Sequence, residues 1–347
     1  MQKQKKKKKL WQKALIALIS AALATGIILL CAVGYFRLPV NAYYKASEKA
    51  FEIPGLSDGF IAQGIAYDER EDTFFVSGYM KDKSVSPLYL VKKTSGETYK
   101  TLYLKNESDE AYYGHCGGVA VHGKYIYVAG GGEHCLYVYS YEQALGAKNR
   151  AYLPCLGLFS LSAGENDYLG AAFVTVWDNA LVAGEFYREG NYPTLPSHQR
   201  TASSGDYNPA IALCFPFVTE GEEDAAFGLK AEPSAAVSLP ALVQGAYFEN
   251  GKAVLSSSYG AAFSHLYEYD LSRAETGETI AIFGAELPLY SLDSSSLVRK
   301  IKIPPMSEEI VAVDGKTYVM CESASDKYMF GKLTGGKWCY ATDLSKL

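Results

Sequence analysis

Polar side chains recur at one position of a pattern that the sequence repeats several times. Gln63, Gln244 and Glu309 each stand directly before the first residue of a short segment that has the composition of a β-strand. If the fold brings these positions together, two amides and a carboxylate form a polar site for a small molecule or a peptide. Another copy is preceded by His115, which could form an acid/base pair with Glu185 or Glu309. These last three residues are the candidates for catalysis.

Further polar groups follow the second strand of several copies, so the candidate ligand-binding set is larger. It consists of Gln63, His115, Glu185, Tyr187, Gln244, Ser257, Tyr259, Glu309 and Glu322. The alternative interpretation is structural, because polar side chains inside a channel also satisfy backbone groups and ordered waters. The carboxylates of the set would also suit a metal-dependent hydrolase. The doublets His115-Cys116 and His134-Cys135 have the content of a zinc site but not its usual short spacings, so we assign no metal site from the pattern.

The repeated unit is a pair of strands joined by a turn, and its first strand typically opens with a small residue. Five copies are visible, at 63–78, 117–130, 172–184, 244–257 and 309–321. Third strands follow at 88–91, 136–139, 211–214 and 266–269, and fourth strands follow at 100–104 and 297–303. A recurrence of roughly 40 to 75 residues is typical of repeat architectures. Four-stranded antiparallel units arranged radially form a β-propeller, so we predict an all-β propeller.

Five blades are visible, and a sixth could lie in residues 226–242 or 279–292. The last unit ends after its third strand at 338–341, whereas a further strand at 49–53 precedes the first unit. We expect this N-terminal strand to complete the last blade, because an unpaired edge would remain exposed otherwise. The segment 188–208 is rich in Pro, Ser, Gly and Asn, which indicates a long loop inserted in the third unit.

The residue pattern of these repeats resembles that of the propeller superfamilies of gluconolactonase, paraoxonase and YVTN-repeat proteins. The phrases QGIAYD, GEFYREGNYPTLPSH, SSSYG and PPMSEE resemble an uncharacterised bacterial family of membrane-anchored propellers. The resemblance covers nearly all of the chain after the N-terminal segment and implies the propeller fold. Lactonase-type members hold calcium on Glu, Asn and Asp side chains in the channel, which makes calcium a possible cofactor. That ligand set has no residue-by-residue counterpart here, so the fold carries more weight than the hydrolytic activity.

The N-terminus has the pattern of a membrane anchor. A basic tail, residues 1–13, precedes an uncharged apolar stretch, residues 14–35, that would span about 33 Å as a helix. The positive charges before this stretch favour a cytoplasmic N-terminus and place a spacer, residues 36–47, and the propeller, residues 48–347, outside. A cleaved signal peptide is the alternative, although its apolar region is typically about 7 to 15 residues long.

Charge separates the tail from the rest of the chain. Residues 38–347 contain 25 basic and 38 acidic residues, a net charge of −13, which argues against nucleic acid as a partner. The basic tail is suited to anionic lipid headgroups. We therefore expect a membrane-anchored extracytoplasmic module whose channel mouth binds a small molecule, a peptide or an envelope component. The alternatives are a calcium-dependent hydrolase of lactones, esters or phosphate esters, and a protein-interaction scaffold with an inert channel.

Six of the seven cysteines lie after the anchor, where disulfides can persist. Cys321 and Cys339 fall in neighbouring strands of the last unit, so they are the pair that strand geometry favours for a disulfide. We nevertheless expect two buried free thiols rather than a disulfide, because free cysteine is a common small core residue.

Overall fold

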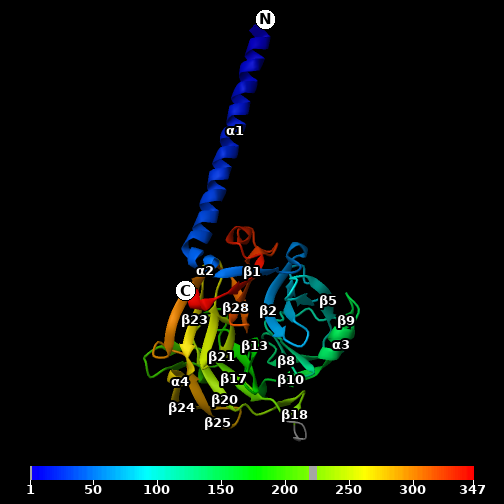
Figure 1. The fold of residues 1–347 in the computed structure, drawn as a ribbon, viewed down its shortest axis with the longest axis vertical. Coiled ribbons are helices and arrows are strands. Elements are labelled where there is room, and N and C mark those ends of the chain that lie inside the picture. Colours follow the sequence, from blue (N-terminus) through cyan, green and yellow to red (C-terminus); the bar gives the residue numbers. More distant parts are fainter. Residues whose placement is uncertain (1, 219–224) are drawn as a thin grey trace.

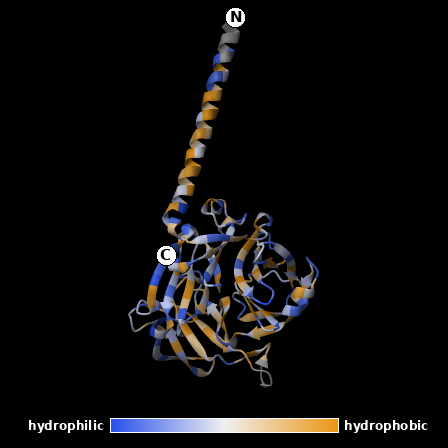
Figure 2. Cartoon of the chain, in the orientation of Figure 1, coloured by the Kyte–Doolittle hydropathy of each residue, from blue (hydrophilic) through white to orange (hydrophobic). Residues whose placement is uncertain are grey.

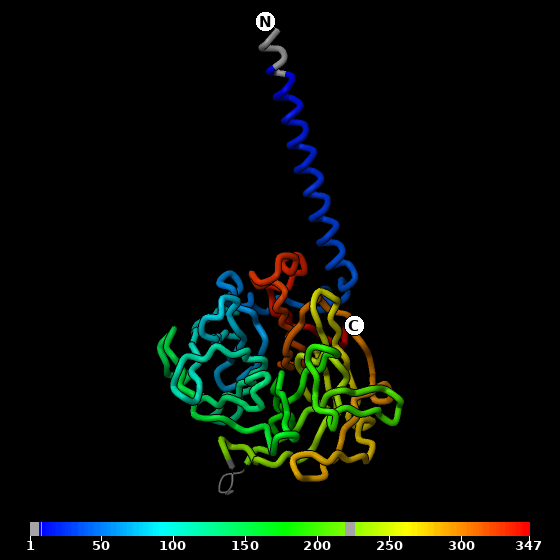
Figure 3. Tube along the Cα trace, turned by 180° about the vertical axis from the view of Figure 1, so that it is seen from behind, coloured from blue at the N-terminus to red at the C-terminus, as the bar shows by residue number. Residues whose placement is uncertain are grey.

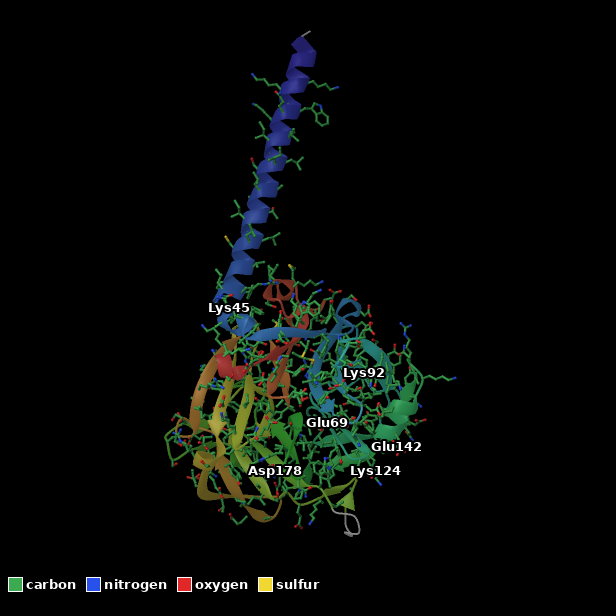
Figure 4. All side chains as sticks on the ribbon, viewed as in Figure 1. Lys45, Glu69, Lys92, Lys124, Glu142 and Asp178 are labelled. Atoms are coloured by element: carbon green, nitrogen blue, oxygen red, sulfur yellow. The ribbon has the colours of Figure 1, made fainter. Side chains whose placement is uncertain are left out.

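The computed structural model describes residues 2–218 and 225–347. A long helix, α1 (Gln2–Arg37), stands away from a body made of β-sheets (Figure 1). The middle of α1 is apolar (Figure 2), and the helical stretch from Lys9 to Lys45 is long and apolar enough to cross a membrane. The short helices η1 (Leu38–Val40) and α2 (Asn41–Lys45) join α1 to the body, with Lys45 at the junction (Figure 4).

The body is a β-propeller of five blades. Blade 1 contains β2 (Phe60–Asp68), β3 (Thr73–Met80), β4 (Pro87–Lys92) and β5 (Thr98–Leu104), and β9 (Tyr152–Leu153) adds to it in parallel with β5. Blade 2 contains β6 (Val119–His122), β7 (Tyr125–Ala129), β8 (Cys135–Ser140) and β10 (Cys155–Ser160). Blade 3 contains β13 (Ala171–Trp177), β14 (Ala180–Glu185), β17 (Ala210–Pro216) and β20 (Ala235–Leu239).

The remaining two blades complete the ring. Blade 4 contains β21 (Val243–Glu249), β22 (Lys252–Ser257), β23 (Ser264–Asp270) and β26 (Leu297–Ile303). Blade 5 contains β27 (Ser307–Val313), β28 (Lys316–Cys321), β29 (Trp338–Thr342) and β1 (Ser47–Glu52). The innermost strands contact one another in the ring order β2, β6, β13, β21, β27. The predicted propeller is thereby confirmed.

Short elements decorate the blades. Three two-stranded hairpins consist of β11 (Ser162–Gly164) with β12 (Asp167–Tyr168), β15 (Arg200–Thr201) with β16 (Tyr207–Asn208), and β18 (Ala225–Ala226) with β19 (Leu229–Lys230). The helices of the propeller are α3 (Tyr141–Gly146), α4 (Leu271–Ala274), η2 (Leu56–Asp58), η3 (Pro196–His198), η4 (Glu322–Ala324), η5 (Gly331–Thr334) and η6 (Leu344–Lys346). The predicted insertion in the third unit is present, since η3, β15 and β16 lie between β14 and β17.

A sixth blade is absent from the described residues, and both segments that could have formed one belong to blade 3. Residues 226–242 contain β20, which is the fourth strand of that blade. Residues 279–292 fall in the hairpin of β24 (Glu275–Ile282) and β25 (Ala285–Ser291), which extends the same sheet because β25 pairs in parallel with β20. Both segments therefore form strands, as their composition indicated, but these strands belong to the sheet of blade 3.

The N-terminal strand closes the ring as predicted. β1 pairs antiparallel with β29 and becomes the outer strand of blade 5. Phe51 of β1 lies 5.2 Å from Phe74 of blade 1, and Phe74 in turn lies 4.8 Å from Tyr318 of blade 5, measured between ring centroids. All three rings are buried. The closing strand therefore contributes to the apolar contact between the first and last blades.

Apolar packing holds the blades to one another. Five clusters of buried hydrophobic side chains occur in the described part of the chain, and each draws residues from two adjacent blades. Between blades 3 and 4, for example, the rings of Trp177 and Phe248 stack with centroids 4.7 Å apart. Small residues on the inner strands permit the close approach, because a Cβ added to Gly64 would lie 2.7 Å from the backbone nitrogen of Val119. This explains why the repeated pattern opens with a small residue.

The favoured cysteine pair does not form a disulfide. Cys321 and Cys339 are both free and buried. β28 and β29 pair Thr317 with Thr342 and Val319 with Tyr340, and the continuation of this register places Cys339 opposite Met320. The two cysteines are therefore offset by one residue, and side chains at adjacent strand positions point to opposite faces of the sheet.

Candidate functional site

The centre of the channel is organised by a buried carboxylate. Glu309 on β27 accepts hydrogen bonds from the backbone nitrogens of Ile65 at 2.7 Å, Val119 at 3.1 Å and Val174 at 3.0 Å. Its neighbour on the remaining inner strand is Gly245, where an added Cβ would lie 2.4 Å from the Glu309 Cα. Burial raises the pKa of Glu309, and the three N–H donors oppose that shift. One side chain from blade 5 thus joins the inner strands of blades 1, 2 and 3.

A cavity of about 750 Å³ opens at one mouth of the channel. Six of the predicted ligand-binding residues line it, which are Gln63, His115, Glu185, Gln244, Tyr259 and Glu322. The other three lie elsewhere. Glu309 is fully buried in the channel, Ser257 is buried in β22, and Tyr187 packs against the apolar cluster between blades 3 and 4. The lining comes from all five blades or the loops that follow their strands.

β-Bulges in the inner strands direct several of these side chains toward the cavity. The pairing register shifts around Gln63 in β2, around Gln244 in β21 and across the pair Glu308 and Glu309 in β27. A bulge places an extra residue in one strand and re-aims its side chain. Ile310 pairs with Val319 as Ile65 pairs with Val76, so Glu308 is the structural equivalent of Gln63.

This register corrects the alignment of the repeats by one residue. The sequence pattern assigned Glu309 to the polar position because Glu309 precedes an apolar strand. The structure shows instead that Glu309 occupies the position of the glycine in the other copies, and that Glu308 faces the cavity. Glu309 is consequently a structural residue of the channel, and its neighbour is the candidate for ligand contact.

The acidic side of the cavity consists of Glu308 and Glu322. Glu308 is only 3% exposed, and its carboxyl group has no hydrogen-bond or ion-pair partner among the residues that the structure describes. Glu322 accepts hydrogen bonds from the Tyr328 hydroxyl at 2.6 Å and from the Gln63 amide at 3.2 Å. Burial raises the pKa of both carboxyl groups, and the nearby charge of Glu322 raises that of Glu308 further.

Lys327 lies beside this pair. Its ammonium group donates a hydrogen bond to the Tyr79 hydroxyl and lies 5.0 Å from the Tyr79 ring centroid and 5.1 Å from that of Tyr328. Its positive charge lowers the pKa of Glu308 and Glu322 in opposition to burial. The positive charge of Lys327 therefore lies beside two carboxyl groups at this side of the cavity.

Aromatic rings form the opposite wall. Phe186 lies 5.4 Å from Tyr192 and 6.4 Å from Tyr259, measured between ring centroids. The Arg188 guanidinium lies 3.9 Å from the Tyr259 ring centroid and holds that ring in place. Tyr192 belongs to the inserted segment between β14 and β17, so the insertion shapes the cavity. A planar or cationic ligand group would find π-faces here.

The predicted acid/base pair of His115 with Glu185 does not match the hydrogen bonding. The Nδ1 of His198 lies 2.9 Å from a carboxylate oxygen of Glu185, and the other oxygen accepts a hydrogen bond from the Ile211 backbone nitrogen at 3.1 Å. His198 is buried, and its Nε2 has no partner among the described residues. His115 instead packs against the ring of Tyr79 at 4.6 Å, and burial lowers its pKa to about 4.

Within the described residues, three or more His, Cys, Asp or Glu side chains nowhere gather in an arrangement that could hold a metal ion.

No family model matches the chain, and no curated protein matches it in sequence. Solved structures with a similar fold include a glutaminyl cyclase from Myxococcus xanthus, at 13% identity and a TM-score of 0.43, covering 85% of this chain and 94% of that chain. A putative oxidoreductase (glucose dehydrogenase) from Thermus thermophilus has 12% identity and a TM-score of 0.40, covering 82% and 95%. Hydrazine synthase from Kuenenia stuttgartiensis has 10% identity and a TM-score of 0.39, covering 75% and 80%. Similarities this low give no information about ligand or reaction.

Proposed function

We propose that this chain is a membrane-anchored extracytoplasmic binding module that takes a small molecule or the end of a peptide into the cavity at its channel mouth. The observation that carries the proposal is the carboxyl group of Glu308, which lies in the wall of that cavity and has no hydrogen-bond partner among the described residues. A hydrogen bond between this group and a ligand would contribute about 0.5 to 3 kcal/mol to binding.

The charge balance indicates what that partner is. Glu308 and Glu322 have a single lysine, Lys327, beside them, and burial favours the protonated form of both carboxyl groups when the cavity is empty. A second positive charge, supplied by a ligand, would favour the form in which both are ionised. The aromatic wall across the cavity offers π-faces, which also attract cations. We therefore propose a ligand that carries a basic nitrogen, such as a free amine on a small molecule, a peptide or an envelope component.

Thermal unfolding of the full chain in detergent tests this proposal. A panel of amines, amino sugars and short peptides with free N-termini is compared with the N-acetylated form of each compound. We expect amines to raise the melting temperature of the wild-type protein, their acetylated forms to have less effect, and Glu308→Gln to abolish the difference. Glu69→Gln changes an exposed glutamate in the turn between β2 and β3, which does not line the cavity, and is the matched control. Equal responses to amines and acetylated compounds would contradict the proposal.

The anchor is a separate part of the proposal. The apolar helix supports membrane attachment, and the basic residues before it support a cytoplasmic N-terminus. Segments such as QGIAYD and PPMSEE also resemble a family of membrane-anchored propellers. A cysteine introduced at the exposed turn residue Asn250 reports on topology. We expect a membrane-impermeant maleimide to label Asn250→Cys in intact cells, and labelling only after lysis would place the propeller on the cytoplasmic side.

Hydrolysis with calcium is the alternative that the resemblance suggested. It requires a bound ion, so elemental analysis of the purified protein separates the two functions. Calcium below one ion per chain is the result expected for a binding module, and stoichiometric calcium together with esterase or lactonase turnover would favour the hydrolase.

A further inference from the structure

Two neighbouring apolar side chains protrude from the propeller without a partner. Met329 is 84% exposed and Phe330 is 65% exposed, the highest values for large apolar residues in the described part of the propeller. They end the loop of residues 325–330, which connects η4 with η5 and which we call the η4–η5 loop. Adjacent exposed apolar side chains at such a protrusion are typical of sites that contact a protein or a membrane.

The η4–η5 loop lies next to the base of α1. η5 contacts α1, and the Arg37 guanidinium donates a hydrogen bond to the Leu333 carbonyl oxygen at 3.2 Å. The Tyr44 hydroxyl donates to the carbonyl oxygen of Thr334. Figures 1 and 3 both show this part of the chain, coloured towards red, at the edge of the propeller from which α1 leaves. The loop and the apolar helix therefore stand on the same side of the molecule.

The loop has a fixed conformation. Gly331 packs so tightly on the chain that an added Cβ would lie 1.5 Å from the Ser323 carbonyl oxygen. The Ser323 and Thr334 hydroxyls are 2.8 Å apart, and the Thr334 hydroxyl also donates to the Gly331 carbonyl oxygen at 2.6 Å. These contacts tie η4 to η5 at the base of the loop. The exposure of Met329 and Phe330 is thus a consequence of an ordered structure.

The surroundings match the chemistry of a bilayer interface. The last turns of α1 and the residue after it expose Tyr35 at 65% and Leu38 at 74%, so apolar surface continues from the helix toward the loop. Arg37 lies in the same region and supplies positive charge beside that surface, whereas Lys332 forms an ion pair with Asp326 of the η4–η5 loop. Aromatic residues and basic residues are enriched where a protein enters the headgroup region.

We infer that Met329 and Phe330 insert into the interfacial region of the bilayer that α1 enters, so that the propeller touches the membrane at a second point. The inference rests on the proposed anchorage, and it concerns a surface outside the cavity. Because Lys327 and Tyr328 line the cavity and directly precede Met329, this contact would hold the ligand site at a fixed height above the membrane.

Quenching by brominated lipid tests the inference with the full chain in phosphatidylcholine and phosphatidylglycerol vesicles. Phe330→Trp places a reporter in the loop, and Leu156→Trp places one at an exposed position of β10, on a blade away from α1 (Figure 1). We expect brominated lipid to remove the emission that Phe330→Trp adds and to leave the emission that Leu156→Trp adds. Equal quenching of the two would overturn the inference.

Two further outcomes separate the possible occupants. If the tryptophan at position 330 is shielded from aqueous iodide but is not quenched by brominated lipid, the loop is covered by a second copy or another protein, and the membrane contact is refuted. If the wild-type chain does not float with vesicles, the anchorage itself fails and the inference fails with it. Amine binding in the cavity is measured without lipid and is independent of either outcome.

Discussion

Replacing Glu309 with alanine is expected to destabilise the whole propeller. The side chain lies at the axis and accepts three hydrogen bonds from the inner strands of blades 1, 2 and 3. Alanine removes both carboxylate oxygens at once. The backbone nitrogens of Ile65, Val119 and Val174 then lose the acceptor that the carboxylate provides.

The magnitude follows from the number of donors. An unsatisfied buried donor costs about 1 to 3 kcal/mol, so three donors give a loss of about 3 to 9 kcal/mol if no water replaces the carboxylate. A domain has a free energy of unfolding of about 5 to 15 kcal/mol, so this loss approaches the total. Glu309→Gln keeps one oxygen. If that oxygen serves Ile65 and Val119, which share one carboxylate oxygen, only Val174 loses its acceptor, and the expected cost is about 1 to 3 kcal/mol.

Urea denaturation of the full chain in detergent measures both variants, with the emission of Trp177 and Trp338 as the signal. The expected order of stability is wild type, Glu309→Gln, Glu309→Ala. Glu69→Ala, at an exposed position of the turn between β2 and β3, serves as the control and should unfold with the wild type. A free energy of unfolding for Glu309→Ala within about 1 kcal/mol of the wild-type value would refute the structural role of this carboxylate.

Three other predictions follow from the cavity and the ring closure. Glu308 has a raised pKa in the folded protein, so the folded state keeps a proton that the unfolded state loses, and wild-type stability should fall as pH rises above 4.5 toward that pKa. In melting curves, Glu308→Gln should reduce this dependence of stability on pH. An unchanged dependence would contradict the prediction. A chain starting at Ser57 lacks β1 and should melt below one starting at Ser47, whereas equal melting temperatures would refute the closure. Gln63→Ala or Gln244→Ala should weaken amine binding by about 0.5 to 3 kcal/mol in calorimetry without unfolding the protein, and unchanged affinity in both would move the site to the rim.

Much of the fold could be predicted because the same physics acts in every blade. Inner strands pack on their neighbours at the axis, so residues such as Gly64 and Gly245 must be small, and the recurrence of small residues is visible in the sequence. The closing strand could be inferred because the last unit lacks an outer partner. The hairpin of β24 and β25 could not be assigned, since its composition alone does not distinguish a new blade from two strands added to an existing one.

The strand positions that form the site could be predicted, but the residue of β27 that faces the cavity could not. Gln63, Gln244 and Glu322 line the cavity because equivalent positions of the inner strands and strand ends converge at one mouth. A bulge shifts a strand by one residue, and the doublet of Glu308 and Glu309 offers two carboxylates for one polar position. His198 was missed because it comes from the inserted segment, which has no repeat period to align. The adjacent glutamates Glu308 and Glu309 were the one sign of this shift in the sequence, because either of them could occupy the polar position of the repeat.

The most direct test of the central claim is a crystal structure of the protein with the amine that gives the largest thermal shift. We expect electron density for the ligand inside the cavity, with its nitrogen within hydrogen-bond distance of the Glu308 carboxyl group and its body against the rings of Phe186 and Tyr192. Density at the outer rim with Glu308 still unpartnered, or a ligand that meets the cavity through an anionic group, would contradict it.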